Sequence, residues 1–187
     1  NDDALKVDFP PFNKIISNLP YQISSPITFK FLDYDFDLAI LMYQKEFADR
    51  MNGKVGTKDY SRLSAMLYFK CDVEKLTDVS CESFIPKPQI DSTVVKLTPK
   101  ENKIPDDDFK TYSKFTKALF QHRNKKIRNA LIDSRHIISG IDKKVLKRNL
   151  NEIEDERLIE YLKKRVVVLD PEEILFISRE LKPAFEE

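Results

Sequence analysis

Glycine is scarce in this chain, which has only three glycines, Gly53, Gly56 and Gly140, among 187 residues. No two of them form a Gly-x-Gly cluster. Glycine-rich loops let a nucleotide approach the backbone closely after a strand, because glycine has no Cβ and tolerates unusual backbone angles. The 187 residues therefore contain no nucleotide-binding loop of that kind.

Cysteine, tryptophan and long apolar runs are also scarce or absent. Cys71 and Cys81 are the only cysteines, they have no metal-ligand spacing, and no histidine pair lies beside them. We therefore expect no metal site and a reducing, cytoplasmic location. No apolar run is long enough to cross a bilayer and the first residues do not form a signal peptide, so we expect no membrane partner.

The remaining composition is that of an ordinary globular protein, with 41% hydrophobic and 34% charged residues. A chain of this length can bury a sizeable core, as one large domain or as one domain plus a small appendage. The composition argues against disorder.

The stretch Asn18-Leu19-Pro20-Tyr21 follows the apolar run Lys14-Ile15-Ile16-Ser17. This pattern predicts a buried parallel strand that ends at a polar residue and a proline. Ser24-Ser25-Pro26-Ile27 then predicts a helix with serine at its cap and proline in its first turn. The amide, backbone carbonyls and phenol ring between them suit a flat substrate that carries an amine.

The following elements predict an alternation of strands and helices. Residues 36–43 form an apolar run typical of a buried strand, and 45–51 and 60–70 have helical patterns separated by a mobile loop at 53–61. Residues 73–79 and 93–97 predict two consecutive strands. Two strands in succession favour an antiparallel edge on a parallel sheet.

Residues 83–92, Ser-Phe-Ile-Pro-Lys-Pro-Gln-Ile-Asp-Ser, connect those two strands. The prolines restrict the loop to an extended path, which we expect to leave Phe84 pointing into a crevice.

The segment 100–108 is charged, contains proline and lacks apolar periodicity, so we place a domain boundary at residue 103, with domains 1–103 and 104–187. Beyond it we expect helices, including residues 143–150 and 153–164. A further helix starts at Asp170-Pro171 and stops before Pro183.

Between Phe109 and Ile132 the chain has seven Lys or Arg residues and no acid, although its total charge is +1. Everything outside that segment sums to −6, so a basic patch faces an otherwise acidic protein. On a helix, such cations would span neighbouring phosphates, and asparagines would reach sugars or base edges.

Three motifs, in this order and spacing, resemble the ribosomal RNA small-subunit adenine dimethyltransferases, the KsgA-type enzymes, in an archaeal form. They are Asn18-Leu19-Pro20-Tyr21, the loop Phe84-Ile85-Pro86-Lys87-Pro88, and Arg123-Asn124-Lys125-Lys126-Ile127-Arg128-Asn129. The resemblance implies a Rossmann-like α/β sheet that binds S-adenosylmethionine, with an antiparallel edge, followed by a small all-α domain. Because this fold needs a glycine-rich loop upstream, we expect the chain to be a fragment without the cofactor-loop half of its catalytic domain.

The resemblance also implies residue roles. Asn18, Leu19, Pro20, Tyr21 and Phe84 would form the catalytic pocket, with Tyr21 and Phe84 stacking on the target base. The cofactor would contact Asp3, Ala4, Asn18 and Pro20. Ribosomal RNA would contact Arg62, Lys87, Arg123, Asn124, Lys125, Lys126, Arg128 and Asn129, and no metal is involved.

The implied reaction transfers methyl groups to two adjacent adenosines near the 3′ end of small-subunit ribosomal RNA, on a 30S-type subunit, by a monomeric enzyme. The fragment alone would be inactive. A non-catalytic ribosome assembly factor is a second interpretation. A large-subunit RNA methyltransferase is a third, against which Leu19 and the 123–131 segment argue, because those relatives usually have Asn-Ile-Pro-Tyr and a different basic helix. A DNA adenine methyltransferase is a weaker one.

Overall fold

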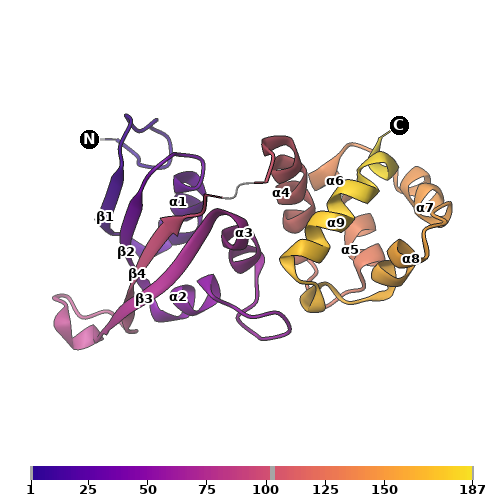
Figure 1. The fold of residues 1–187 in the computed structure, drawn as a ribbon. Helices are drawn as coiled ribbons and strands as arrows, with labels where there is room; N and C mark the ends of the chain where they lie inside the picture. Colours follow the sequence, from indigo (N-terminus) through magenta and orange to yellow (C-terminus); the bar gives the residue numbers. More distant parts are fainter. Residues whose placement is uncertain (1, 102–103, 187) are drawn as a thin grey trace. The chain divides into compact units, whose positions relative to one another are not determined.

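The computed structural model describes residues 2–101 and 104–186, and their contacts divide them into two compact units (Figure 1). The first unit comprises residues up to Asn52 together with residues from Leu67 to the end of the sheet, and the second comprises Gly53–Met66 and the residues from Ile104 onward. The boundary expected at residue 103 lies outside the described residues. The segment 53–66, which that boundary assigns to the first domain, packs with the helical unit.

The first unit is a four-stranded sheet with helices. Its elements are β1 (Lys14–Asn18), α1 (Ser24–Phe31), β2 (Leu38–Gln44), α2 (Lys45–Met51), β3 (Cys71–Val79) and β4 (Ser92–Pro99). The order across the sheet is β1-β2-β4-β3. β1 and β2 pair in parallel, whereas β4 is antiparallel to both β2 and β3. The predicted α/β fold with an antiparallel edge is confirmed.

The core of this unit lies on one face of β2 and β4. Ala39, Leu41 and Tyr43 alternate along β2 with no exposed surface, as strand geometry requires of a face covered by helices. The Tyr43 hydroxyl meets the Thr28 hydroxyl of α1 at 2.7 Å, which joins helix to sheet. Burial raises the pKa of Tyr43.

Two expectations about the start of this unit are wrong. β1 is not a buried strand: Ile16 is 80% exposed, because β1 lies at the edge of the sheet and its residues alternate between exposed and half-buried. Ser24 does not cap α1 either. A 3₁₀ turn at Tyr21–Ile23 runs directly into the helix, so Ser24 is its first residue and its buried hydroxyl makes no hydrogen bond among the described residues.

The second unit is helical. It contains α4 (Asp106–Phe120), α5 (Ile127–Asp133), α6 (Arg135–Ile138), α7 (Lys143–Asn151), α8 (Glu156–Lys163) and α9 (Pro171–Leu181). α4 packs against α5, α6 and α9, with Tyr112, Phe115 and Leu119 fully buried. The predicted start of α9 is confirmed: the Asp170 side chain accepts from the Glu173 backbone, Glu173 reciprocates, and Pro171 follows the cap.

The segment 53–66 is part of this unit through buried tyrosines. The Tyr60 hydroxyl donates to the Leu169 carbonyl at 2.7 Å, and the Tyr112 hydroxyl donates to the Ala65 carbonyl at 2.7 Å. Helix α3 (Arg62–Lys70) begins in this segment and continues into the first unit.

The loop at 53–61, which was expected to be mobile, makes hydrogen bonds to the helical unit. Gly56 adopts a φ of +81°, which favours glycine, and its N–H donates to the Val167 carbonyl at 3.0 Å. A Cβ on Gly53 would lie 2.3 Å from the Asp59 carbonyl oxygen, so the loop closes tightly on itself. In the described residues no helix has the length and apolarity to cross a membrane.

Candidate functional site

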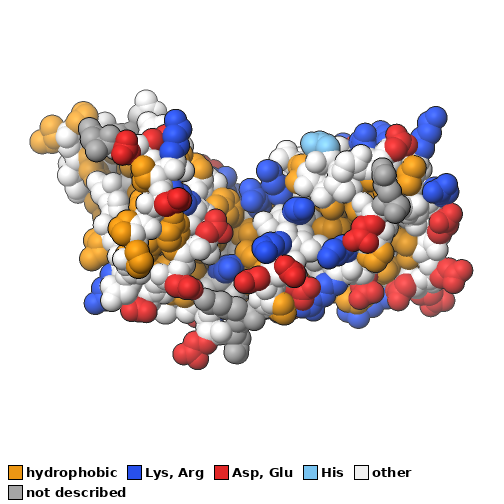
Figure 2. Space-filling model, turned by 90° about the horizontal axis from the view of Figure 1, so that it is seen from above, with side chains coloured by type: hydrophobic (Ala, Val, Ile, Leu, Met, Phe, Trp, Pro, Cys, Tyr) orange, Lys and Arg blue, Asp and Glu red, His pale blue; other side chains and the backbone are white. Residues whose placement is uncertain are grey.

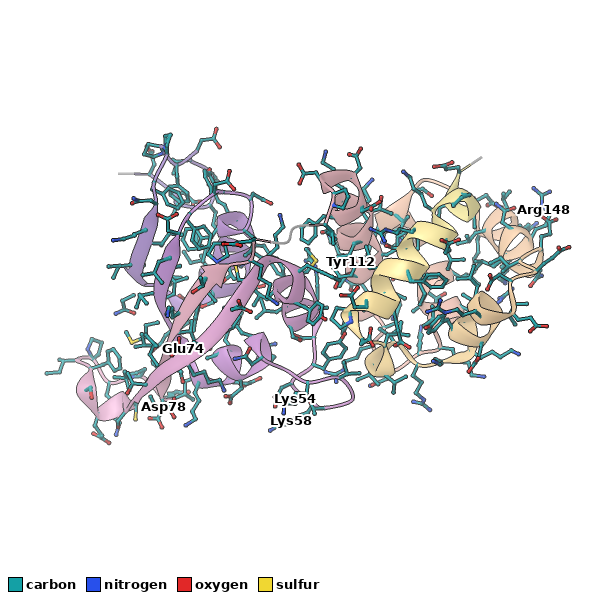
Figure 3. The ribbon with its side chains drawn as sticks, in the orientation of Figure 1. Lys54, Lys58, Glu74, Asp78, Tyr112 and Arg148 are labelled. Carbon is teal, nitrogen blue, oxygen red and sulfur yellow. The ribbon has the colours of Figure 1, made fainter. Side chains whose placement is uncertain are left out.

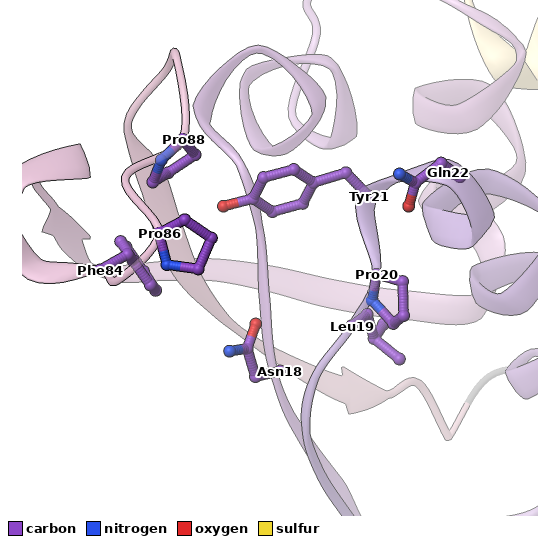
Figure 4. Close-up of a pocket in the computed structure, with 8 residues that line it drawn as sticks. All are labelled: Asn18, Leu19, Pro20, Tyr21, Gln22, Phe84, Pro86 and Pro88. Atoms are coloured by element: carbon purple, nitrogen blue, oxygen red, sulfur yellow. The ribbon is translucent and has the colours of Figure 1, made fainter.

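Residues at the carboxyl end of β1 and in the proline-rich loop line one cavity of about 280 Å³. Its lining comprises Asn18, Leu19, Pro20, Tyr21, Gln22, Phe84, Pro86 and Pro88 (Figure 4). The Asn18–Tyr21 motif and the proline-rich loop are separated by more than sixty residues in sequence. The sheet brings them together, because β2 pairs with β1 on one side and the first residue of β4 pairs with the last residue of β2 on the other. The five residues expected to form the catalytic pocket thus share one cavity.

Asn18 is the last residue of β1 and its side chain is exposed. Its amide makes no side-chain hydrogen bond within residues 2–101 and 104–186. In Figure 4 it points toward the space bordered by Phe84, Pro86 and Tyr21. An amide held at the end of a strand offers one acceptor and two donors to a ligand in that space.

The backbone after Asn18 is less open than expected. The Pro20 carbonyl accepts the Ile23 N–H at 3.1 Å in the 3₁₀ turn. No backbone hydrogen bond to the Leu19 carbonyl occurs among the described residues. Of these two carbonyls, that of Leu19 is available as an acceptor beside the Asn18 side-chain amide.

Tyr21 is hydrogen-bonded to the start of β4. Its hydroxyl lies 2.7 Å from the hydroxyl of Ser92, the buried first residue of β4. This bond fixes the phenol ring, because it leaves the hydroxyl no freedom to turn toward solvent. Ser92 ends the segment 83–92 that connects the two predicted strands, but its contact with Tyr21 could not be predicted from the sequence.

The proline-rich loop is held at both of its ends. The Ser80 hydroxyl accepts from the Glu82 N–H at 3.2 Å, and the Asp91 carboxylate accepts from the Cys81 N–H at 2.9 Å. The Ile85–Pro86 peptide bond is cis. Phe84 lines the cavity as predicted, whereas Lys87 is exposed and pairs with Glu82.

The residues expected to contact the cofactor do not all line the same cavity. Asn18 and Pro20 line the cavity already described. Ala4 lines a second, apolar cavity of about 410 Å³ along β1, with Phe9, Ile15 and Phe31. Asp3 is exposed; its carboxylate accepts from the Leu5 N–H at 3.0 Å and lies 3.6 Å from the Lys6 ammonium.

The predicted basic helix is interrupted, which corrects one expectation. α4 ends at Phe120, residues 121–126 form a turn, and α5 begins at Ile127. The turn forms because its backbone pairs with a distant segment. The Val167 N–H donates to the Arg123 carbonyl at 3.0 Å, and the Val166 N–H donates to the Lys125 carbonyl at 3.1 Å. These tertiary bonds override helix propensity.

Several cations of this segment have partners within the protein. Arg123 donates to the Thr57 and Lys58 carbonyls, both at 2.9 Å. Lys125 lies 2.8 Å from the Asp133 carboxylate, and Arg128 donates to the Asn151 side-chain oxygen at 2.6 Å. Asn124, Lys126 and Asn129 are exposed. Arg62 is half-buried at the start of α3, and burial lowers its pKa.

Charge on the helical unit is therefore mixed. Figure 2 shows Lys and Arg side chains interspersed with Asp and Glu on the face that it presents. Within the described residues no group of three metal-ligating side chains comes together.

Comparison with known proteins identifies the family. A family model described as Ribosomal RNA adenine dimethylase matches residues 1–173. A probable ribosomal RNA small subunit methyltransferase A from Methanosphaera stadtmanae is 52% identical over 177 residues, covering 95% of this chain and 62% of that protein. One from Methanothermobacter thermautotrophicus is 46% identical over 180 residues, covering 96% and 62%. The chain thus spans about three fifths of these relatives' length.

Solved structures agree. A dimethyladenosine transferase from Plasmodium falciparum superposes with a TM-score of 0.76 at 29% identity, over 98% of this chain and 71% of that one. The 23S rRNA methyltransferase ErmE gives a TM-score of 0.59 at 22% identity, over 96% and 69%, a likeness of fold. With a family model that covers almost all of the sequence, the chain belongs to the ribosomal RNA adenine dimethylase family.

Proposed function

We propose that the intact protein transfers methyl groups from S-adenosylmethionine to the exocyclic amines of two adjacent adenosines near the 3′ end of small-subunit ribosomal RNA. The observation that carries this proposal is the shared cavity of Asn18, Tyr21 and Phe84. An exposed amide between two aromatic side chains suits a flat base with an amine. Archaeal relatives near 50% identity, described as small-subunit enzymes, support the choice of RNA.

Asn18 and Leu19 would activate the amine. The nitrogen of adenine's amine is a poor nucleophile, since its lone pair is delocalised into the ring. Two acceptors, the Asn18 side-chain oxygen and the Leu19 carbonyl, would hold both N–H bonds and favour a pyramidal nitrogen. Held in this way, the amine nitrogen would accept the methyl group that the cofactor supplies, and its surplus proton would pass to water. Catalysis then rests on positioning and fixed dipoles rather than on a strong base.

Tyr21 and Phe84 would hold the base outside its helical stack. An enzyme that modifies a base must extrude it, and aromatic stacking compensates part of that cost. The Ser92 bond keeps the Tyr21 ring in place before the base arrives. Lys87 and Arg62 would contact the flanking backbone.

The groups present fit S-adenosylmethionine in part. Asp3 offers an exposed carboxylate for the cofactor's adenine amine, and Asn18 and Pro20 border the reacting centre. When bound, the cofactor supplies an electrophilic methyl group on a sulfonium. Because the 187 residues have no glycine-rich loop, we propose that they do not methylate RNA alone.

The second half of the chain would position the RNA. We propose that the helical unit contacts a 30S-type subunit through Asn124, Lys125, Lys126, Arg128 and Asn129, while the unit that contains the sheet belongs to the catalytic domain. The enzyme would act as a monomer in the cytoplasm, where small subunits are assembled. Arg123 would act indirectly, through the loop that it holds.

Replacement of Asn18 tests the proposal. In a chain extended to the length of its relatives, Asn18→Ala should lower methyl transfer to small subunits about 100-fold or more, because it removes an amine acceptor. RNA binding should be unchanged. Gln22→Ala is the matched control, since it removes an exposed amide that lies beyond Tyr21 on the same rim (Figure 4). Equal activity of Asn18→Ala and wild type would contradict the proposal.

A non-catalytic assembly factor is the second candidate, favoured by the missing glycine-rich loop. The same experiment separates the two. An extended chain that binds small subunits but neither binds nor consumes S-adenosylmethionine would be an assembly factor that retains the fold.

A further inference from the structure

A polar cavity of about 300 Å³ lies between α5 and α7 in the helical unit. Four cations line it: Lys125 and Arg128 near the start of α5, and Lys143 and Lys147 on α7. Asp133 is the only carboxylate in the lining, so four positive charges and one negative charge leave a net charge of +3. The two α7 lysines are not among the RNA-contacting residues that the family resemblance implies.

The helical repeat of α7 explains why Lys143 and Lys147 both line the cavity. Lys143 and Lys147 are four residues apart and therefore lie on one face, while Leu146 and Leu150 are buried on another. The Asp142 side chain accepts the Lys144 N–H at 2.7 Å and fixes the first turn. Lys144 and Arg148, also four residues apart, do not line the cavity; Arg148 is labelled on α7 in Figure 3.

The positive charge of the cavity is only partly compensated. Asp133 lies 2.8 Å from the Lys125 ammonium and 3.9 Å from that of Lys143, and the bond with Lys125 is the main cause of its lowered pKa. Arg128 is held by neutral acceptors, the Asn151 side chain and the Lys147 carbonyl. Lys147 has no ion pair among the residues described.

We propose that this cavity binds a backbone phosphate of RNA. The inference rests on the proposed RNA substrate and extends the RNA-facing surface from residues 123–129 to α7. Arg128, held by Asn151, lines the same cavity as Lys143 and Lys147, and the cavity is large enough for one phosphate group. Exposed Asn129 at the lining can reach the adjoining sugar. Asp133 pairs with Lys125 and Lys143 in the unbound protein and competes with the phosphate for them.

Two double variants of α7 test this proposal in the full chain. Lys143→Gln with Lys147→Gln removes two cavity cations, and Lys144→Gln with Arg148→Gln removes two cations of the same helix outside the cavity. Binding is measured at several salt concentrations, on a small-subunit 3′-terminal RNA and on an unrelated RNA of equal length. The cavity variant should weaken both by roughly tenfold and lower the salt slope by about 1. The control should stay within about twofold.

Each other outcome overturns the proposal. Equal weakening by both variants would mean that α7 contributes only diffuse charge. Unchanged RNA binding, with inorganic phosphate still shifting the Arg128 side-chain NMR signals, would make the cavity a free-anion site. Asp133→Asn gives an independent sign, since loss of the competing carboxylate should tighten RNA binding and looser binding would contradict the mechanism.

The same measurements distinguish failure of the cavity proposal from failure of the proposed methyltransferase function. A phosphate contact carries no sequence information, so the cavity variant should weaken the unrelated RNA equally. If the wild-type chain shows no preference for small-subunit RNA, or the extended chain no methyl transfer, the proposed function is wrong while the cavity result stands.

Discussion

At the scale of single residues, the hydrogen bond between Tyr21 and Ser92 joins a cavity-lining residue to the start of β4. Tyr21→Phe keeps the ring but leaves the buried Ser92 hydroxyl without its partner. We expect the free energy of unfolding to fall by about 1–2 kcal/mol, the usual effect of such a loss. Denaturant unfolding measures this change.

The matched variant is Ser92→Ala, which removes the other hydroxyl. The double variant Tyr21→Phe with Ser92→Ala should cost less than the sum of the two single variants, because the two hydroxyls act as a pair. Strict additivity would show that the two hydroxyls do not interact in solution.

At the scale of elements, Arg123 acts as a clamp on the loop at 53–61. It donates to two loop carbonyls, and the loop exposes Lys54 and Lys58 (Figure 3). Arg123→Lys keeps the charge but cannot reproduce the forked contact. We expect faster amide exchange at residues 56–60 and faster tryptic cleavage after Lys54 and Lys58.

Lys126→Gln serves as the control for this clamp, since Lys126 is exposed in the same turn. It should leave the exchange rates of the loop unchanged. Equal loop protection in Arg123→Lys and wild type would show that the Gly56–Val167 bond and the buried Tyr60 suffice to fix the loop.

The sequence predicted most elements, because their patterns are local. β2 reads as an apolar run, Asp170-Pro171 marks the start of α9, and the two successive strands were correctly interpreted as an antiparallel edge. The exposure of β1 depends on which strands lie beside it in the sheet, and the hydrophobic periodicity of its own sequence carries no information about that. The turn at 121–126 likewise depends on bonds to Val166 and Val167, some forty residues away in sequence.

The sequence likewise predicted part of the candidate site and missed the rest. Asn18, Tyr21 and Phe84 were predicted to act together, and the sheet places them in one cavity. Their catalytic roles stay predictions. The partner of Tyr21 and the share of α7 in the cationic cavity were missed, although the spacing of Lys143 and Lys147 was a visible signal.

At the scale of the whole molecule, the helical unit is discontinuous in sequence. It takes up residues 53–66 in addition to those after 104. A fragment of residues 104–187 therefore loses the acceptor for the Tyr112 hydroxyl and the ring of Tyr60, which packs on Phe120 at 5.4 Å. We expect this fragment to unfold at clearly lower denaturant concentration than the helical unit of the intact chain, because large buried side chains contribute several kcal/mol each.

A peptide of residues 53–70 added to that fragment should restore part of the lost stability, whereas a peptide with Tyr60→Ala should not. Denaturant unfolding followed by circular dichroism measures both. A fragment as stable without the peptide as with it would show that the unit does not need the segment.

The same discontinuity sets an order of events while the chain is being made. The acceptor of the Tyr60 hydroxyl lies 109 residues further along the chain, and the donor to Ala65 lies 47 residues further. Contacts that distant form late, since each needs a long stretch of chain to be present and ordered. In a nascent chain that has completed its sheet, the Tyr60 hydroxyl still lacks its acceptor until Leu169 leaves the ribosome. A stall before that residue thus leaves the Tyr60 side chain, which is buried in the folded protein, accessible to chaperones or to aggregation.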